Sequence, residues 1–265
     1  MSEIDDLFAD LRSKGRKALM PFLTAGDPDL EFTCQSLREL ADVGASLCEV
    51  GIPYSDPIAD GPVIQASYQR ALDQKIKFSE ILDSISTVSS KISMPLVTMV
   101  SYAIILRRGL ERFVVSAKLA GFSGAIVPDL LVEESSQLRE ICRREDFSLI
   151  QLVTPTTPRD RQNRIADSTT GFIYFVSVTG ITGERTELPA ELLENVSWLR
   201  EQTPLPVCIG FGISHPDHIK RLAPVADGLI VGSAFIRRAA QATTKGREHA
   251  LADMRSFAKS LIDAM

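Results

Sequence analysis

Eight short apolar runs, separated by longer segments with helical spacing, most restrict how this chain of 265 residues can fold. We predict strands at Ala18–Leu23, Leu47–Val50, Leu96–Val100, Gly124–Val127, Leu149–Val153, Phe172–Val176, Val207–Gly210 and Gly228–Val231. Helical patterns lie between them, at Thr33–Asp42, Glu111–Leu119, Glu133–Arg144, Leu192–Glu201 and Pro216–Leu222. Eight strand-helix units predict an α/β fold of the (β/α)8 TIM-barrel type, although a doubly wound open sheet has the same alternation.

Two segments are additions to this repeating unit. The apolar residues of Ile4–Leu11 have helical spacing, which predicts an extra N-terminal helix that covers the bottom of the barrel. The stretch from Pro53 to about Lys77 is too long for a simple strand-helix loop, so we expect an inserted loop and a short helix from Val63 after the second strand. No linker rich in Pro, Gly or Ser divides the sequence, and we expect residues 1–265 to form a single barrel domain.

Composition favours a soluble enzyme. Hydrophobic residues make up 45% of the chain, no run of about 18 apolar residues occurs, and the N-terminus is acidic, unlike a signal peptide. We therefore expect a cytoplasmic protein without membrane segments. The net charge of −5 argues against nucleic acid as a partner. Cys34, Cys48, Cys142 and Cys208 lack metal-ligand spacing and are expected to be buried thiols.

The stretch EVGIPYSDPIADGP, Glu49 to Pro62, places two candidate catalytic carboxylates in a segment that contains three prolines. Glu49 follows an apolar run and is expected where a buried strand ends, so desolvation would raise its pKa and let it exchange protons with a substrate. Asp60 follows in the same stiff segment, which would present both groups at one cleft. The alternative is structural: Glu49 on the rim, and Asp60 as a helix cap ahead of Pro62.

The same stretch resembles the family of tryptophan synthase alpha subunits, in which E-x-G-x-P leads into S-D-P-x-A-D-G-P. Further stretches match in family order along nearly the whole chain, at Pro21–Pro28, Val127–Ser135, Tyr174–Gly183, Ile209–Ser214 and Val231–Ala234. The resemblance implies a lyase of tryptophan biosynthesis that reversibly cleaves indole-3-glycerol phosphate by a retro-aldol reaction. Its products would be indole and glyceraldehyde 3-phosphate.

Roles for the two carboxyls fit this reaction. The indole ring must be protonated at the carbon that carries the glycerol chain while the adjacent hydroxyl loses a proton, and we assign this exchange to Glu49. The positive charge that develops on the indole nitrogen needs a fixed anion, which we assign to Asp60.

Glycine-bearing turns near the ends of the last three predicted strands are candidates for phosphate binding. Glycine lets a backbone N–H approach an anion closely, and Ser233 is expected to open a short helix whose N-terminus favours negative charge. The resemblance places Gly183, Gly212, Gly232 and Ser233 at phosphate-binding positions.

Several aromatic and apolar residues are expected in or near the substrate pocket, although each also suits ordinary packing. Tyr174 matches a family tyrosine near the catalytic carboxyls, and Phe211 lies between two of the phosphate-site glycines. The remaining candidates are Phe22, Ile64 and Tyr102, with Asp129 close by.

No cofactor or metal is expected. The lysines, such as Lys91 and Lys118, lie in polar or helical contexts that do not suit a Schiff base. His215, His218 and His249 are the only histidines and do not form a metal-ligand cluster.

A tryptophan synthase beta subunit is the implied partner, in an alpha2-beta2 heterotetramer. Two departures from the family pattern concern the loops that face this partner. Ile104 stands near the position of a usual Asn after Tyr102, and Leu131 replaces a usual Pro. Alternatives are a free-standing indole-3-glycerol phosphate lyase and a catalytically silent barrel that binds a phosphorylated ligand and activates a partner.

Overall fold

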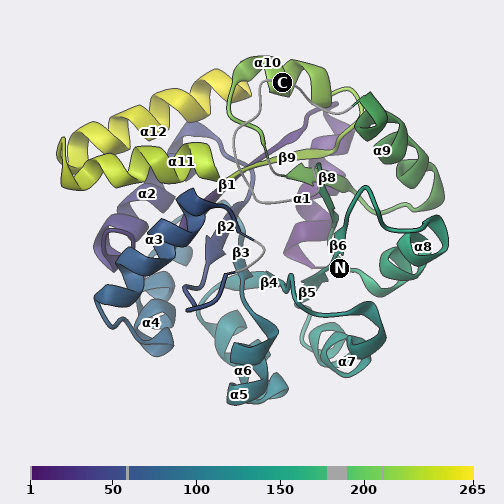
Figure 1. The fold of residues 1–265 in the computed structure, drawn as a ribbon, viewed down its shortest axis with the longest axis horizontal. Helices are drawn as coiled ribbons and strands as arrows, with labels where there is room; N and C mark the ends of the chain where they lie inside the picture. The colour runs from purple at the N-terminus through teal and green to yellow at the C-terminus, as the bar shows by residue number, and fades with distance from the viewer. Residues whose placement is uncertain (1, 58–59, 178–189, 211) are drawn as a thin grey trace.

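The computed structural model describes residues 2–57, 60–177, 190–210 and 212–265, and the strands within them form one parallel barrel (Figure 1). These are β1 (Ala18–Thr24), β2 (Cys48–Gly51), β3 (Leu96–Met99), β4 (Phe122–Ile126), β5 (Ser148–Ile150), β6 (Leu152–Val153), β7 (Ile173–Val176), β8 (Val207–Gly210) and β9 (Gly228–Val231). Their order, β5-β4-β3-β2-β1-β9-β8-β7-β6, begins and ends with sequence neighbours, so the sheet closes on itself. The predicted (β/α)8 barrel is confirmed.

Helices surround the barrel in the order expected for a strand-helix repeat (Figure 1). They are α1 (Glu3–Ser13), α2 (Leu30–Val43), α3 (Pro62–Asp73), α4 (Phe78–Ser89), α5 (Tyr102–Arg108), α6 (Leu110–Leu119), α7 (Ser136–Arg144), α8 (Arg159–Ser168), α9 (Ala190–Gln202), α10 (Pro216–Leu222), α11 (Ser233–Ala239) and α12 (Arg247–Ile262). Two short 3-10 helices, η1 (Val132–Glu134) and η2 (Ala240–Thr243), complete the set in the described residues. The helix predicted over Glu133–Arg144 is therefore divided, because the chain turns at Ser135 between η1 and α7.

The fifth predicted strand is also divided, at the point where the barrel closes. β5 pairs with β4, whereas β6 pairs with β7. Gln151 lies between the two short strands, and its carbonyl accepts a hydrogen bond from the backbone N–H of Tyr174 on β7. One continuous segment thus changes its hydrogen-bonding neighbour and joins the two ends of the sheet.

Side chains along each strand alternate between the barrel interior and the surrounding helices. On β1, Met20 and Phe22 belong to the interior apolar cluster, while Leu19 and Leu23 pack in the outer cluster with the helices. The same alternation on β2 puts Cys48 and Val50 outside. Glu49, between those two residues, therefore faces the barrel interior.

Helix α1 closes the N-terminal end of the barrel, as predicted, and lies behind the strands in Figure 1. Its residues Ile4, Phe8 and Leu11 are buried. The ring of Phe8 lies 5.8 Å from that of Phe172, just before β7. Because α1 covers this end, the opposite end, where the strands finish, is the one available for a ligand.

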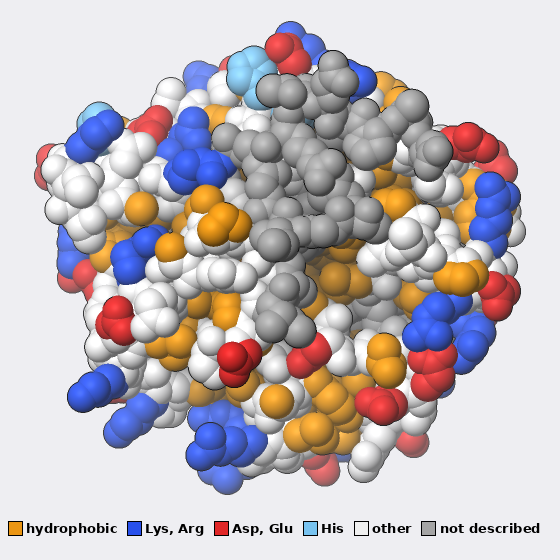
Figure 2. Space-filling view, viewed as in Figure 1, with side chains coloured by type: hydrophobic (Ala, Val, Ile, Leu, Met, Phe, Trp, Pro, Cys, Tyr) orange, Lys and Arg blue, Asp and Glu red, His pale blue; other side chains and the backbone are white. Residues whose placement is uncertain are grey.

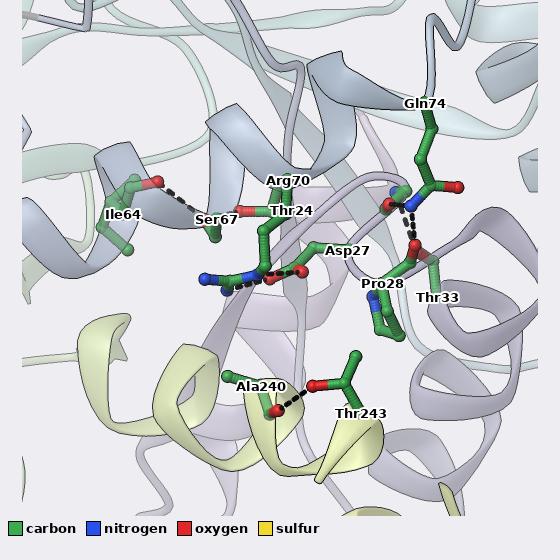
Figure 3. A network of polar contacts seen from close by, with 11 residues as sticks. Thr24, Asp27, Pro28, Thr33, Ile64, Ser67, Arg70, Gln74, Ala240 and Thr243 are labelled. Atoms are coloured by element: carbon green, nitrogen blue, oxygen red, sulfur yellow. Dashed lines mark hydrogen bonds and ion pairs between the residues drawn. The ribbon is translucent and has the colours of Figure 1, made fainter.

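The predicted insert after β2 is present, and its helix α3 begins at Pro62, a residue suited to the first helical position. Arg70 on α3 donates two hydrogen bonds, of 2.7 and 2.6 Å, to the buried carboxylate of Asp27 (Figure 3). The hydroxyls of Thr24 and Ser67 are 2.6 Å apart in the same network. These contacts fix the insert helix against the end of β1.

The four cysteines are buried free thiols, as predicted from their apolar surroundings. Among the described helices, none is both long enough and apolar enough to cross a membrane.

Candidate active site

Glu49 lies on β2, two residues before the strand ends, and is completely buried, with 0% of its surface exposed. Neither carboxyl oxygen has a hydrogen-bond partner in the described part of the chain. Desolvation by burial raises the pKa of Glu49 well above its ordinary value. This carboxyl therefore holds its proton at a pH where an exposed glutamate would be ionised, and the interpretation of Glu49 as a rim residue is wrong.

The surroundings of Glu49 are apolar rings and tyrosine hydroxyls. Its register partners in the sheet are Phe22 on β1 and Val97 on β3. Burial raises the pKa of Tyr174 on β7, and the charge of Glu49 raises it further. The same two causes act on Tyr68 of α3, together with Asp60 and Tyr54. A proton donor or acceptor at position 49 is thus shielded from bulk water by the groups around it.

Asp60 lies in the loop that precedes α3 and is partly buried. Burial raises its pKa to about 6. Its backbone is held in a turn, since its N–H donates to the Pro57 carbonyl and its own carbonyl accepts from the side chain of Gln65. Gly61, not Asp60, caps α3, and no side chain donates or accepts at that cap. The capping alternative for Asp60 is therefore wrong.

The two carboxyls influence the pKa values of the same two tyrosines. The charge of Asp60, like that of Glu49, raises the pKa of both Tyr68 and Tyr174. Their own pKa values are raised by different degrees, well above the ordinary value for Glu49 and only to about 6 for Asp60. The two carboxyls thus differ in their tendency to hold a proton, and Asp60 is ionised above about pH 6.

The apolar pocket candidates divide into two groups. Phe22, Ile64 and Tyr174 are buried in the interior cluster, close to Glu49. Tyr102 packs instead against the outer cluster, at the first turn of α5. The carboxylate of Asp129 accepts hydrogen bonds from the N–H of Tyr102 and the hydroxyl of Ser101, so it stabilises the start of this helix.

The phosphate candidates adjoin the same interior cluster. Gly232 caps α11, which begins at Ser233. A Cβ at Gly232 would lie 3.8 Å from Phe22 and 3.9 Å from Ile64, so this turn borders the apolar pocket. Gly212 has a φ of 78°, a conformation that favours glycine. Gly183 and Phe211 lie outside the described residues.

Two glycines inside the strands make room for the aromatic residues. A Cβ at Gly51 would lie 2.5 Å from the ring of Phe22 and 2.7 Å from the hydroxyl of Tyr68. One at Gly210 would lie 2.2 Å from the hydroxyl of Tyr174. All three distances are shorter than real Cβ contacts, so these two strand positions must lack a side chain for the rings to lie where they do.

Sequence reasoning missed Tyr68. It lies one helical turn after Ile64 on α3 and packs in the interior cluster with it. Its ring is 5.6 Å from that of Tyr54, in the loop after β2. The spacing of Ile64 and Tyr68 was the available signal, since residues four apart share one face of a helix.

The barrel mouth has the composition of a small-molecule site with few polar groups. Figure 2 shows a hollow near the centre of this face, with apolar side chains visible inside it. In the described residues, no group of three or more His, Cys, Asp or Glu side chains is arranged to hold a metal ion. Two carboxyls in an apolar cleft suit proton transfer to a largely apolar substrate.

Comparison with known proteins places the whole chain in one family. A family model described as tryptophan synthase alpha chain matches residues 8–265. The tryptophan synthase alpha chain of Rhodopirellula baltica is 60% identical over 250 residues, which cover 93% of this chain and 90% of the relative.

Solved structures agree with the sequence matches. The tryptophan synthase subunit alpha of Legionella pneumophila superposes with a TM-score of 0.91 at 32% identity, covering 100% of this chain and 98% of that one. A Pyrococcus furiosus chain, from a structure described as the basis of mutual activation of the tryptophan synthase a2b2 complex, gives a TM-score of 0.86 at 38% identity. That match covers 93% of this chain and 98% of the other.

Proposed function

The chain belongs to the tryptophan synthase alpha chain family, and we propose that it cleaves indole-3-glycerol phosphate reversibly into indole and glyceraldehyde 3-phosphate. One observation carries the proposal: Glu49 is a completely buried carboxyl without a hydrogen-bond partner in the described residues, and it faces the interior at the open end of the barrel. A group of this kind is costly to retain unless it works on a substrate.

Glu49 exchanges the protons of the reaction. Its protonated form gives a proton to the indole carbon that carries the glycerol chain, and its ionised form takes the proton of the adjacent hydroxyl. The carbon–carbon bond then breaks, its electron pair stays with the indole ring, and the hydroxyl-bearing carbon becomes the aldehyde. The raised pKa of Glu49 supports this role, because burial favours the protonated form that donates to the ring.

Asp60 supplies the fixed negative charge. Protonation of the ring carbon places positive charge on the indole nitrogen, and an ionised carboxylate in hydrogen-bond reach stabilises it. The short turn that holds the backbone of Asp60 favours this role, because it limits the reorganisation needed during the reaction.

The glycerol phosphate binds toward the last strands of the barrel. Backbone N–H groups at Gly212, Gly232 and Ser233 contact the phosphate, with Gly183 as a further candidate. The position of Gly232 beside Phe22 and Ile64 supports this orientation, because one substrate could then span from the phosphate turn to the apolar pocket. Phe22, Ile64 and Tyr174 enclose the indole ring, with Tyr102 and Phe211 as further candidates.

The physiological assembly in this proposal is an alpha2-beta2 complex in the cytoplasm, with residues 1–265 as one barrel domain. The similarity to the Pyrococcus furiosus chain, whose structure is that of an a2b2 complex, supports the partner. Leu106, on α5, and Leu131, just before η1, are 55% and 54% exposed and offer apolar area for docking.

The test is to incubate the purified chain with indole-3-glycerol phosphate and measure indole, with and without the beta subunit of the same source. We expect turnover that accelerates on complex formation. Efficient turnover without complex formation or acceleration would favour a free-standing lyase. Absence of indole in both conditions would contradict the enzymatic proposal and favour a silent binding barrel.

A further inference from the structure

A cavity of about 550 Å³ lies on the outer side of the barrel, lined by residues from the end of β2 to α6. Its lining includes Ile52 and Phe78, and its charged residues are Lys77, Arg107, Arg108 and Arg112. None of the residues proposed to bind or convert substrate lines it. The cavity is therefore separate from the active site.

The four cations of this cavity lack acidic partners. No carboxylate lines the cavity, and none of the four side chains forms an ion pair within the described part of the chain. Glu111 pairs with Arg144 at 2.7 Å. The carboxylate of Glu80 accepts a hydrogen bond from the backbone N–H of Lys77 and forms no ion pair with the Lys77 side chain. Four positive charges around one cavity thus stay uncompensated.

Local helix stability does not explain this arrangement. Arg107 and Arg108 lie in the last turn of α5, where a cation is favourable. Lys77, however, caps the N-terminus of α4, and Arg112 lies in the first turn of α6. Cations at these positive helix ends oppose the helix dipole, so both residues are placed against local stability.

Arg108 links the charged residues of the cavity to its apolar residues. Its guanidinium lies 4.2 Å from the centre of the Phe78 ring, which stacks in turn with Phe113 at 5.9 Å. Burial lowers the pKa of Arg108, and the charge of Arg112 lowers it further. A stacked guanidinium with a like charge beside it is prepared to receive an anion together with an apolar group.

We propose that this cavity binds a small organic anion with an aromatic or aliphatic body. The anionic group contacts Arg108, Arg112 and Lys77, while the body enters between Ile52 and Phe78. The volume is in the range of small-molecule sites. Figure 2 shows basic side chains gathered on the lower part of the face, over the region of α4 and α5. The cavity shares no residue with the proposed active site.

The test uses anilinonaphthalene sulfonate, a fluorescent aromatic anion, with excess glycerol 3-phosphate present to occupy the proposed phosphate site. We compare the wild-type chain, a Lys77→Gln/Arg112→Gln variant and an Arg108→Gln variant. The control is Arg38→Gln/Arg143→Gln, which removes the same charge from two exposed arginines elsewhere. The neutral analogue phenylnaphthylamine measures the contribution of the apolar body alone.

We expect Lys77→Gln/Arg112→Gln to weaken sulfonate binding about tenfold, while the control variant stays within about twofold. The melting temperature of the Lys77→Gln/Arg112→Gln variant should be unchanged or higher, because both removed cations oppose a helix dipole. Arg108→Gln should weaken both the sulfonate and the neutral probe. Equal sulfonate affinity in the double variant and its control would overturn the proposal.

Discussion

Phe22 and Glu49 are register partners on the neighbouring strands β1 and β2, so an apolar ring and a buried carboxyl enter the barrel interior at the same level. Burial at this level raises the pKa of Glu49. Phe22 also borders the turn at Gly232, where an added Cβ would lie 3.8 Å from it. One side chain thus belongs to the surroundings of both the proposed proton-transfer group and the proposed phosphate turn.

Replacing Glu49 by glutamine should reduce indole formation about a thousandfold, because the amide keeps the shape but cannot cycle a proton. Binding of glycerol 3-phosphate, measured by calorimetry, should stay near the wild-type value. Near-normal turnover in a folded Glu49→Gln variant would contradict the assignment of Glu49 as the proton-transfer group.

The same variant should change the pH dependence of stability. Burial raises the pKa of Glu49 in the folded state, so its protonation contributes stability that is complete below the unfolded value of 4.5 and is lost as pH rises through the folded value. Glutamine does not titrate. As pH rises above the unfolded value of 4.5, the wild type should therefore lose more free energy of unfolding than Glu49→Gln does. Parallel curves from denaturant titrations would show that Glu49 is not desolvated.

Activity should fall on the acidic side of the pKa of Asp60. Its pKa is raised by burial to about 6, and the proposed role requires the ionised form. Below that pH, kcat/KM should decrease about tenfold per unit, and Asp60→Asn should retain about a hundredth of the activity without this acidic limb. An unchanged limb in the variant would assign the titration to another group.

Two glycine substitutions should separate packing from phosphate binding. Gly51→Ala places a Cβ 2.5 Å from Phe22 and should lower the free energy of unfolding by about 1–3 kcal/mol. Gly232→Ala meets its nearest neighbour at 3.8 Å, so stability should change by less than about 0.5 kcal/mol. Calorimetry should nevertheless show weaker glycerol 3-phosphate binding in Gly232→Ala, and unchanged affinity would place the phosphate elsewhere.

The ion pair that anchors α3 should matter for both stability and catalysis. Arg70→Met leaves the carboxylate of Asp27 buried without its partner, at a cost of about 1–3 kcal/mol. Turnover should also fall, because α3 positions Ile64 and follows directly after Asp60. The control Arg144→Met breaks an exposed pair with Glu111 and should cost less than about 0.5 kcal/mol. Equal losses of stability and turnover in the two variants would contradict a specific role for the Arg70–Asp27 ion pair.

Much of the architecture follows from local sequence patterns. The apolar runs predicted all eight strand positions, and α10 begins and ends at the predicted residues Pro216 and Leu222. Glu49 was recognisable because a carboxylate directly after a buried run is chemically unusual. Such features depend on side-chain chemistry and on the period of the backbone, which a short window of sequence already contains.

Other features could not be predicted in this way. The division of the fifth strand at Gln151 depends on where the sheet closes, and the placement of Tyr68 depends on how α3 packs over the barrel. The capping role considered for Asp60 was wrong because Gly61 forms the cap. Local sequence patterns were enough to predict the repeating strand-helix units and the buried carboxyl. The rings that surround this carboxyl could be identified only in the folded protein, because their positions are set by contacts between segments far apart in the chain.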